Sequence, residues 1–139
     1  MTSGTQMVPL SRMSLWAGRI VSVIPALVLV FGGIMKLLRL PSVLQGFTQY
    51  GYPANSLPVI GILEVGSTVV YLIPRTAVLG AILMTGVLGG AIASNVRIAD
   101  PAFSAPLVLG VLVWGGLYLR EPRLRALIPR REHAARDNS

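Results

Sequence analysis

The sequence predicts an all-α integral membrane protein, a four-helix bundle that spans the bilayer with both termini in the cytoplasm. Three observations lead to this prediction. Of the 139 residues, 53% are hydrophobic and only 12% are charged, about half the charged fraction of a soluble domain. Apolar stretches close to the ~20 residues that cross a bilayer recur along the chain. The basic residues lie outside these stretches, as they do in multi-pass membrane proteins.

The first predicted span covers residues 18–38, because residues 20–35 contain no charged side chain. We expect this segment to be retained as a helix. It is longer than the apolar core of a signal peptide, and no small-residue cleavage site leads into a polar mature region. Residues 1–17 before it form a polar, interfacial segment.

A long connection, residues 39–54, is expected to be a loop before the second span. Its aromatic side chains suit the lipid headgroup layer, and they are Phe47, Tyr50 and Tyr52. The second predicted span covers residues 56–73. Asn55 or Ser56 can cap its first turn, which contains Pro58.

The third and fourth predicted spans cover residues 76–97 and 102–120. Only Pro74 and Arg75 separate the second span from the third, so these two helices must be antiparallel neighbours. Asp100 is followed by a proline, which is a typical start signal for the fourth helix.

Arginine counts predict the orientation. If both termini are cytoplasmic, nine of the 12 basic residues lie on that side and three on the other, as the positive-inside rule requires. The nine are Arg12, Arg19, Arg75, Arg120, Arg123, Arg125, Arg130, Arg131 and Arg136. The three are Lys36, Arg39 and Arg97.

The C-terminal residues 121–139 form a basic cytoplasmic tail. Within it, residues 122–131 place branched apolar side chains among arginines, a pattern that predicts a short helix on the anionic inner surface of the membrane. Residues beyond His133 are expected to be disordered.

The composition excludes several classes of protein. Topology explains the net charge of +7 better than nucleic-acid binding does, so no nucleic-acid partner is expected. The absence of cysteine excludes thiol–disulfide chemistry and thiolate metal sites. The single histidine, His133, lies in the tail, so histidine ligation of haem or zinc inside the membrane is excluded too. No metal site is expected, and the sequence identifies no residues that bind a cofactor.

Glu64 is the principal candidate for chemistry, because it is the only acidic residue within the long apolar segments. A charged carboxylate at the bilayer centre costs roughly 2.5–3.5 kcal/mol on insertion scales. Glu64 must therefore be protonated, be paired, or line a cavity inside the bundle. Ionisable residues inside a membrane usually mark functional sites, so we interpret Glu64 as catalytic.

A polar stripe accompanies Glu64 along one helical face. Ser67, Thr68 and Tyr71 follow it at i+3, i+4 and i+7, so the stripe is expected to face the bundle interior. Thr68 and Tyr71 are candidate ligand-binding residues. The alternative is that the hydroxyl groups only bind neighbouring helices, and for Ser67 and Thr68 the pattern favours that alternative.

Lys36 is the second candidate catalytic residue. It lies near the outer end of the first span, on a face with Gly32 and Gly33, which allow close approach of another helix or a ligand. It could form an ion pair with Glu64, or its ammonium group could extend to the outer headgroups instead. Burial disfavours the charged form of a carboxylic acid and a nearby ammonium favours it, so the sequence leaves open whether Glu64 is a proton donor or a base.

Three further residues are candidate ligand-binding residues. Asn95 and Arg97 end the third span on the same outer side as Lys36 and could form a polar rim over the Glu64 cavity. Trp114 lies deep enough in the fourth span to form a wall of a pocket, although packing is the safer interpretation for it and for Tyr118. Gly86 and Gly90 are spaced as in helix-packing motifs, and we expect them to pack against another helix.

Short motifs in a fixed order resemble a known family. They are Phe31-Gly32-Gly33-Ile34-Met35-Lys36-Leu37, Gly51-Tyr52-Pro53, Ile60-Gly61-Ile62-Leu63-Glu64, Pro74-Arg75 and Gly80-Ala81. Across residues 17–120 the chain resembles the DoxX-like family of small bacterial membrane proteins. The resemblance implies a four-helix membrane bundle in the bacterial inner membrane. It also implies a loose link to redox biology, since the family takes its name from a subunit of a thiosulfate:quinone oxidoreductase. Lys36 and Glu64 fall on the family's charged positions.

Three functions remain open at this point. The leading one is binding of a lipophilic, quinone-like molecule between the helices, with no intrinsic cofactor and with a redox partner protein to carry electrons. The second is a cofactor-free enzyme, an isomerase, cyclase or epoxide-opening enzyme, that uses Glu64 as general acid or base on a lipophilic metabolite. The third is a non-catalytic membrane scaffold. Homo-oligomerisation is compatible with each of them, and whether the protein is an enzyme stays open.

Overall fold

The structure is a computed structural model, and it describes residues 11–127. All regular structure in this range is helical, which confirms the predicted fold class at that level. The elements are α1 (Arg12–Leu37), α2 (Pro41–Gln49), α3 (Ser56–Leu72), α4 (Ala77–Arg97), the 3-10 turn η1 (Pro101–Phe103), α5 (Ser104–Arg120) and α6 (Pro122–Leu127).

Helix α1 begins at Arg12 and not at residue 18, where the predicted span starts. The Ser11 side chain caps it by accepting a hydrogen bond of 3.2 Å from the backbone N–H of Ser14. Its 26 residues extend about 39 Å at ~1.5 Å per residue, more than the ~30 Å apolar layer of a bilayer. The apolar pattern therefore marks the length inside the membrane, and the helix continues beyond it.

Three helical segments in the described range are long and apolar enough to cross a membrane. They are Arg12–Leu37, Ala77–Arg97 and Pro101–Arg120. Helix α3 is apolar but shorter, with 17 residues. Several membrane crossings are thus supported, whereas the crossing by α3 and the cytoplasmic position of both termini stay predictions.

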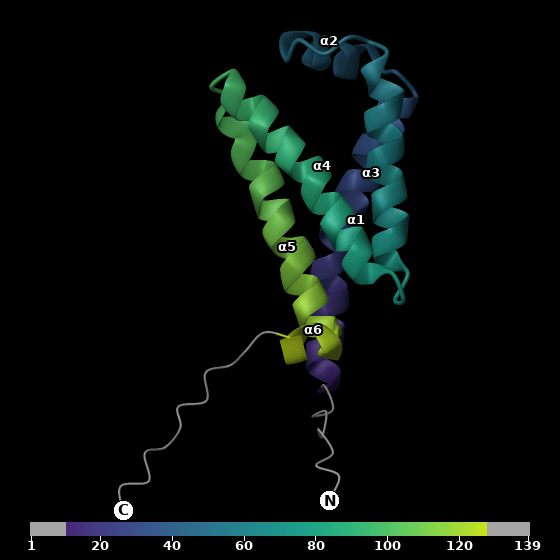
Figure 1. The fold of residues 1–139 in the computed structure, drawn as a ribbon. Coiled ribbons are helices and arrows are strands. Elements are labelled where there is room, and N and C mark those ends of the chain that lie inside the picture. The colour runs from purple at the N-terminus through teal and green to yellow at the C-terminus, as the bar shows by residue number, and fades with distance from the viewer. Residues whose placement is uncertain (1–10, 128–139) are drawn as a thin grey trace, which may run out of the picture.

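The long helices pack in a closed order, with α1 against α5 and α3, α3 against α4, and α4 against α5. Helix α2 lies at one end of the bundle and α6 at the other, beside the start of α1 (Figure 1). The pair α4 and α5 diverges from the pair α1 and α3, and the gap between the pairs widens toward the end of the bundle at which α2 lies (Figure 1). The two ends of the bundle therefore differ in how closely the helices approach.

Glycines allow the closest helix contacts. At the α1–α3 crossing, a Cβ on Gly33 would lie 3.0 Å from the carbonyl oxygen of Gly61, and a Cβ on Gly61 would lie 2.8 Å from the carbonyl oxygen of Gly33. At the α1–α5 crossing, Gly116 lies directly against Ser22. These contacts leave no space for a side chain, so small residues are required there.

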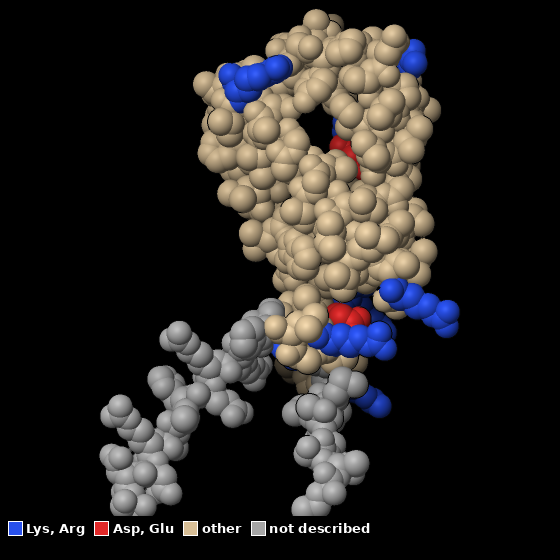
Figure 2. Space-filling model, in the orientation of Figure 1, with Lys and Arg blue, Asp and Glu red and all other residues tan. Residues whose placement is uncertain are grey.

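One cluster of buried side chains forms the hydrophobic core between these crossings. Seven of its eight members come from α3, α4 and α5, and one comes from α1. The members are Leu29, Tyr71, Ala77, Ala81, Met84, Leu88, Val113 and Leu117. The core closes the α6 half of the bundle, whereas the opposite half is hollowed by an opening that is visible in the surface (Figure 2).

The predicted loop 39–54 contains a helix, so that expectation was wrong. Helix α2 has Pro41 in its first turn, where the missing N–H of proline costs nothing. Its polar residues suggested a loop. None of its side chains is buried in the structure, which explains why the helix carries no apolar run that would mark it in the sequence. The other short helix, α6, occupies the first part of the predicted segment 122–131. The rest of that segment, the tail beyond His133 and residues 1–10 lie outside the described residues.

Candidate functional site

An ion pair joins α1 to α3 inside the bundle. The Lys36 Nζ lies 2.8 Å from Oε1 and 2.9 Å from Oε2 of Glu64, so the ammonium donates to both carboxylate oxygens. The Lys36 side chain is 15% exposed and the Glu64 side chain 9% exposed. The sequence left an ion pair and headgroup contact open for Lys36, and the structure shows the ion pair.

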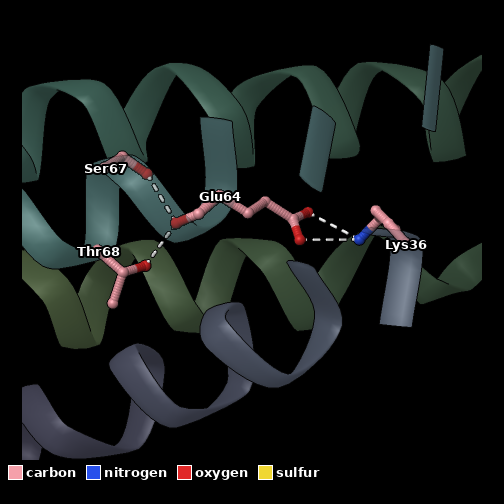
Figure 3. A network of polar contacts seen from close by, with 4 residues as sticks. All are labelled: Lys36, Glu64, Ser67 and Thr68. Carbon is pink, nitrogen blue, oxygen red and sulfur yellow. Dashed lines mark hydrogen bonds and ion pairs between the residues drawn. The ribbon is translucent and has the colours of Figure 1, made fainter. Parts of the chain in front are cut away.

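Local helix geometry fixes the position of Glu64. The hydroxyl groups of Ser67 and Thr68 donate to its backbone carbonyl at 3.1 and 2.7 Å. Both hydroxyl groups point at this carbonyl, and the carboxylate extends from the other side of the residue toward Lys36 (Figure 3). On α1, Gly32 borders the pair, since a Cβ there would lie 3.5 Å from Oε2 of Glu64. The two hydroxyl groups thus orient the helix backbone and leave the carboxylate to the cavity.

The ion pair borders a cavity of about 440 Å³ between α3 and α4, under α2. This size lies within the usual range for small-molecule sites, roughly 300–1,000 Å³. Most of the lining is apolar. The lining residues are Lys36, Phe47, Tyr50, Tyr52, Ile60, Leu63, Glu64, Gly86, Val87, Gly90, Ala91, Ser94 and Asn95.

The cavity opens on a side face of the bundle. Figure 2 shows an opening in the surface with atoms of an acidic residue (red) at its back, and Glu64 is the acidic residue of the lining. The surrounding surface is formed by uncharged residues (Figure 2).

A tyrosine hydrogen-bond network closes the end of the cavity at α2. The Tyr50 hydroxyl donates to Oδ1 of Asn95 at 2.6 Å and lies 3.4 Å from Oδ2 of Asp100. Burial, followed by the negative charge and hydrogen bond of Asp100, raises the pKa of Tyr50 above its usual range. Tyr50 therefore keeps its proton at neutral pH and remains a donor to Asn95.

Two more aromatic residues complete this end. The Tyr52 hydroxyl is 2.7 Å from Oγ of Ser94. The Phe47 ring lies 5.7 Å from the Tyr52 ring, and the Lys36 Nζ lies 5.7 Å from the Phe47 ring centroid. The second distance is within cation–π range. The α2 segment thus contacts both α4 and the ion pair.

The predicted site residues separate into two groups. Glu64, Lys36 and Asn95 border the same cavity. Four predicted residues do not border the cavity and form hydrogen bonds to other parts of the protein: Tyr71, Thr68, Arg97 and Trp114. The Arg97 guanidinium donates to the backbone carbonyl of Tyr50 and so secures the end of α2 without bordering the cavity.

Tyr71 and Trp114 make packing contacts. Tyr71 is fully buried, donates to the carbonyl oxygen of Val113 at 2.7 Å and stacks against the Arg120 guanidinium at 4.6 Å. The Trp114 indole donates to Oγ1 of Thr85 at 2.8 Å, which joins α5 to α4. Neither residue borders the cavity. The polar stripe on α3 continues past the cavity to Tyr71 in the packed half of the bundle, and α5, which carries Trp114, contributes no residue to the cavity lining.

Gly86 and Gly90 do not pack against another helix, contrary to the expectation from their spacing. A Cβ on either residue would meet no atom within 4 Å, and both border the cavity. Sequence spacing could not show this, since the same motif suits a helix crossing and a cavity wall. The close crossings use Gly33, Gly61 and Gly116 instead.

Sequence reasoning missed the aromatic lining of the cavity. Phe47, Tyr50 and Tyr52 were assigned only to the headgroup layer, and the structure places all three on the cavity. The available signal was their position between the spans that carry Lys36 and Glu64. Among residues 11–127, no group of three or more histidine, cysteine or acidic residues could hold a metal ion.

Comparison with known proteins gives one match. The model of the DoxX-like family matches residues 20–116, which include α3 and α4 and most of α1 and α5. This match confirms the resemblance noted in the sequence motifs. Searches of curated proteins and of solved structures found no significant match.

Proposed function

The chain belongs to the DoxX-like family, and we propose that it binds a lipophilic, quinone-like molecule in the cavity beside Glu64 and Lys36. The observation that carries the proposal is the ion pair, which borders a mostly apolar cavity that opens on an uncharged side face of the bundle (Figure 2). With the helices along the membrane normal, such a side face lies against the acyl chains. Glu64 and Lys36 are the proposed contact residues. A redox-linked role with a partner protein as electron carrier belongs to the same proposal.

The cavity lining supports a lipophilic ligand with a small polar head. Ile60, Leu63 and Val87 offer apolar contacts, while the polar groups gather at Lys36, Glu64 and the α2 end. Binding sites for small molecules commonly combine an apolar wall with a few convergent polar groups. A side opening toward lipid suits a ligand that is dissolved in the membrane.

The ion pair supports a head group that carries a carbonyl or a hydroxyl. An ammonium has three N–H donors, and two contacts of Lys36 are directed at Glu64. The remaining N–H can donate to a carbonyl oxygen, and the carboxylate can accept from a hydroxyl. A donor and an acceptor side by side suit the oxidised and reduced forms of a quinone equally, which favours this ligand class over a simple hydrocarbon.

The open space at Gly86 and Gly90 favours ligand binding over the scaffold alternative. An exposed small-residue face on the third or fourth span would also suit a scaffold role, and Gly86 and Gly90 are exposed. Their position on the wall of the cavity that the ion pair borders favours the ligand. Within the described residues the small-residue face is therefore part of the pocket.

Binding of a radiolabelled decyl-benzoquinone to purified protein in nanodiscs tests the proposal. We expect Glu64→Gln and the double variant Glu64→Gln/Lys36→Met to weaken binding about tenfold or more, since each charge-assisted hydrogen bond contributes roughly 1.5–3 kcal/mol. Glu121→Gln is the matched control, because it makes the same chemical change outside the cavity lining and should bind like the wild type.

Two results would contradict the proposal. One is a wild-type protein that does not bind the quinone above the level of empty nanodiscs. The other is Glu64→Gln protein that is folded and binds with wild-type affinity. Conversion of the probe to a new product by the wild type but not by Glu64→Gln would add catalysis to binding.

A further inference from the structure

We propose that Gly86 and Gly90 form a wall on which a planar ring of the ligand lies, and that side-chain size at these two positions determines which ring systems the cavity accepts. This inference rests on the proposed function above. It adds the residues that discriminate between ligands by the size of their rings. The ion pair alone contacts only the polar head of a ligand and cannot make this distinction. The cavity and the ion pair define the site, and the glycines define its shape.

The wall is a strip of bare helix backbone on α4. Gly86 and Gly90 are four residues apart, so they lie on the same helical face about 6 Å from each other. Both border the cavity, and a Cβ on either would meet nothing within 4 Å. Val87 and Ala91 border it beside them. Glycine lets a ligand approach the backbone closely, so this strip offers a flat surface one ring in width.

The other sides of the cavity suit the edges of a ring. Lys36 and Glu64 on α1 and α3 provide a donor and an acceptor. Phe47 and Tyr52 provide aromatic faces, tilted at 52° to each other. A planar ring on the glycine wall can direct a carbonyl at the ion pair and contact these aromatic rings in the tilted geometry that aromatic pairs favour. The tail can leave through the side opening into the acyl chains (Figure 2).

The chain contains a matched control for the wall on the same helix. Gly89 also has no atom within 4 Å of an added Cβ, but it does not border the cavity. A leucine at position 86 or 90 would fill the cavity, while a leucine at position 89 would leave it unchanged. The three variants add the same atoms to α4 and differ only in where those atoms point.

Binding of two radiolabelled probes in nanodiscs tests the inference. They carry the same decyl tail on a one-ring benzoquinone and on a two-ring naphthoquinone. We expect Gly86→Leu and Gly90→Leu to weaken benzoquinone binding about tenfold or more, with Gly89→Leu within about twofold of the wild type. Gly86→Ala and Gly90→Ala should weaken the naphthoquinone more than the benzoquinone, because the added methyl group reduces the space beside the larger ring.

The outcomes separate this inference from the proposed function. Wild-type affinity in folded Gly86→Leu and Gly90→Leu, with binding still lost in Glu64→Gln, overturns the glycine wall and leaves the proposed function standing. Wild-type affinity in Glu64→Gln, or no binding by the wild type, overturns both. If the leucine variants fail to fold, the alanine variants test the glycine wall instead. Their methyl groups meet no atom within 4 Å, so these variants should fold. An equal effect of alanine on both probes overturns selection by ring size.

Discussion

At the residue scale, Lys36 and Glu64 form an ion pair that joins α1 to α3 inside the bundle. Glu64 is 7% exposed, so an unpaired charge there would lack both water and a counter-charge. Burying an ion pair carries a desolvation penalty that can exceed its Coulombic gain, and removal of one partner typically costs 3–5 kcal/mol. The pair is therefore weak evidence for stability, and its position on a cavity favours a functional reason.

The stability of single and double variants separates the cost of leaving one buried charge unpaired from the net contribution of the ion pair to stability. We expect Lys36→Met to destabilise the protein by about 3 kcal/mol, because it leaves a buried carboxylate without its counter-charge. We expect the double variant Lys36→Met/Glu64→Gln to regain most of this loss, since no lone charge remains. Thermal unfolding in detergent, followed by circular dichroism, measures both. A double variant no more stable than Lys36→Met would show that the pair itself holds the helices together.

At the element scale, the α1–α3 crossing brings the two charged residues together. Gly33 and Gly61 allow the backbones to touch. The two helices run in opposite directions (Figure 1), so Lys36 lies one turn from this contact toward α2 and Glu64 one turn toward α6. The long lysine side chain extends back past Gly32 to reach the carboxylate. The sequence indicated that Gly33 allows a close approach by a helix or a ligand, and the structure shows the helix; the sequence did not identify Gly61 as its partner. Gly86 and Gly90 have the spacing usually associated with helix packing, and they border the cavity instead.

A matched pair of alanine variants on α3 tests this crossing. A Cβ at position 61 would lie 2.8 Å from the carbonyl oxygen of Gly33, whereas a Cβ at position 66 would meet nothing within 4 Å. We therefore expect Gly61→Ala to lower the unfolding temperature and Gly66→Ala to keep or raise it, since alanine favours a helix by about 1 kcal/mol over glycine. Differential scanning fluorimetry of both purified proteins compares them. Equal unfolding temperatures would contradict the close crossing.

Helix α2 shows what the sequence leaves undetermined at this scale. It has no buried side chain, so neither periodicity nor an apolar run predicts it. Its end is held by Tyr50, which donates to Asn95 and whose backbone carbonyl accepts from Arg97. These contacts join residues far apart in the chain, and only the folded bundle brings them within reach.

At the scale of the whole molecule, the two ends of the bundle differ in packing and in charge. The α6 end is packed around Tyr71 and Leu117, and basic side chains gather there (Figure 2). The α2 end holds the cavity. The positive-inside rule places the basic end in the cytoplasm, so the cavity is expected in the outer half of the bilayer.

Cysteine labelling tests this topology directly, since the natural sequence contains no cysteine. We expect Gln49→Cys to react with a membrane-impermeant maleimide in intact bacterial spheroplasts, and Ala126→Cys to react only after permeabilisation. Both positions are exposed. Reaction of both in intact spheroplasts would mean that α3 does not cross the membrane, because α4 and α5 alone make two crossings between the two positions and leave them on the same side. A reversed pattern would contradict the cytoplasmic termini.

The sequence by itself determined the all-helical class and the membrane setting, and it selected Glu64 and Lys36 as the candidate site residues. Composition and charge placement report these directly, because a charge inside an apolar run is costly in any arrangement of the helices. Only the tertiary structure decided which glycines pack, which aromatic residues border the cavity, and that Tyr71 and Trp114 lie outside it. In a membrane, lipid and protein core are both apolar, so hydrophobic periodicity does not report how a helix is rotated. Rotation and lean of the helices decide these contacts, and they are set by the packing of the whole bundle.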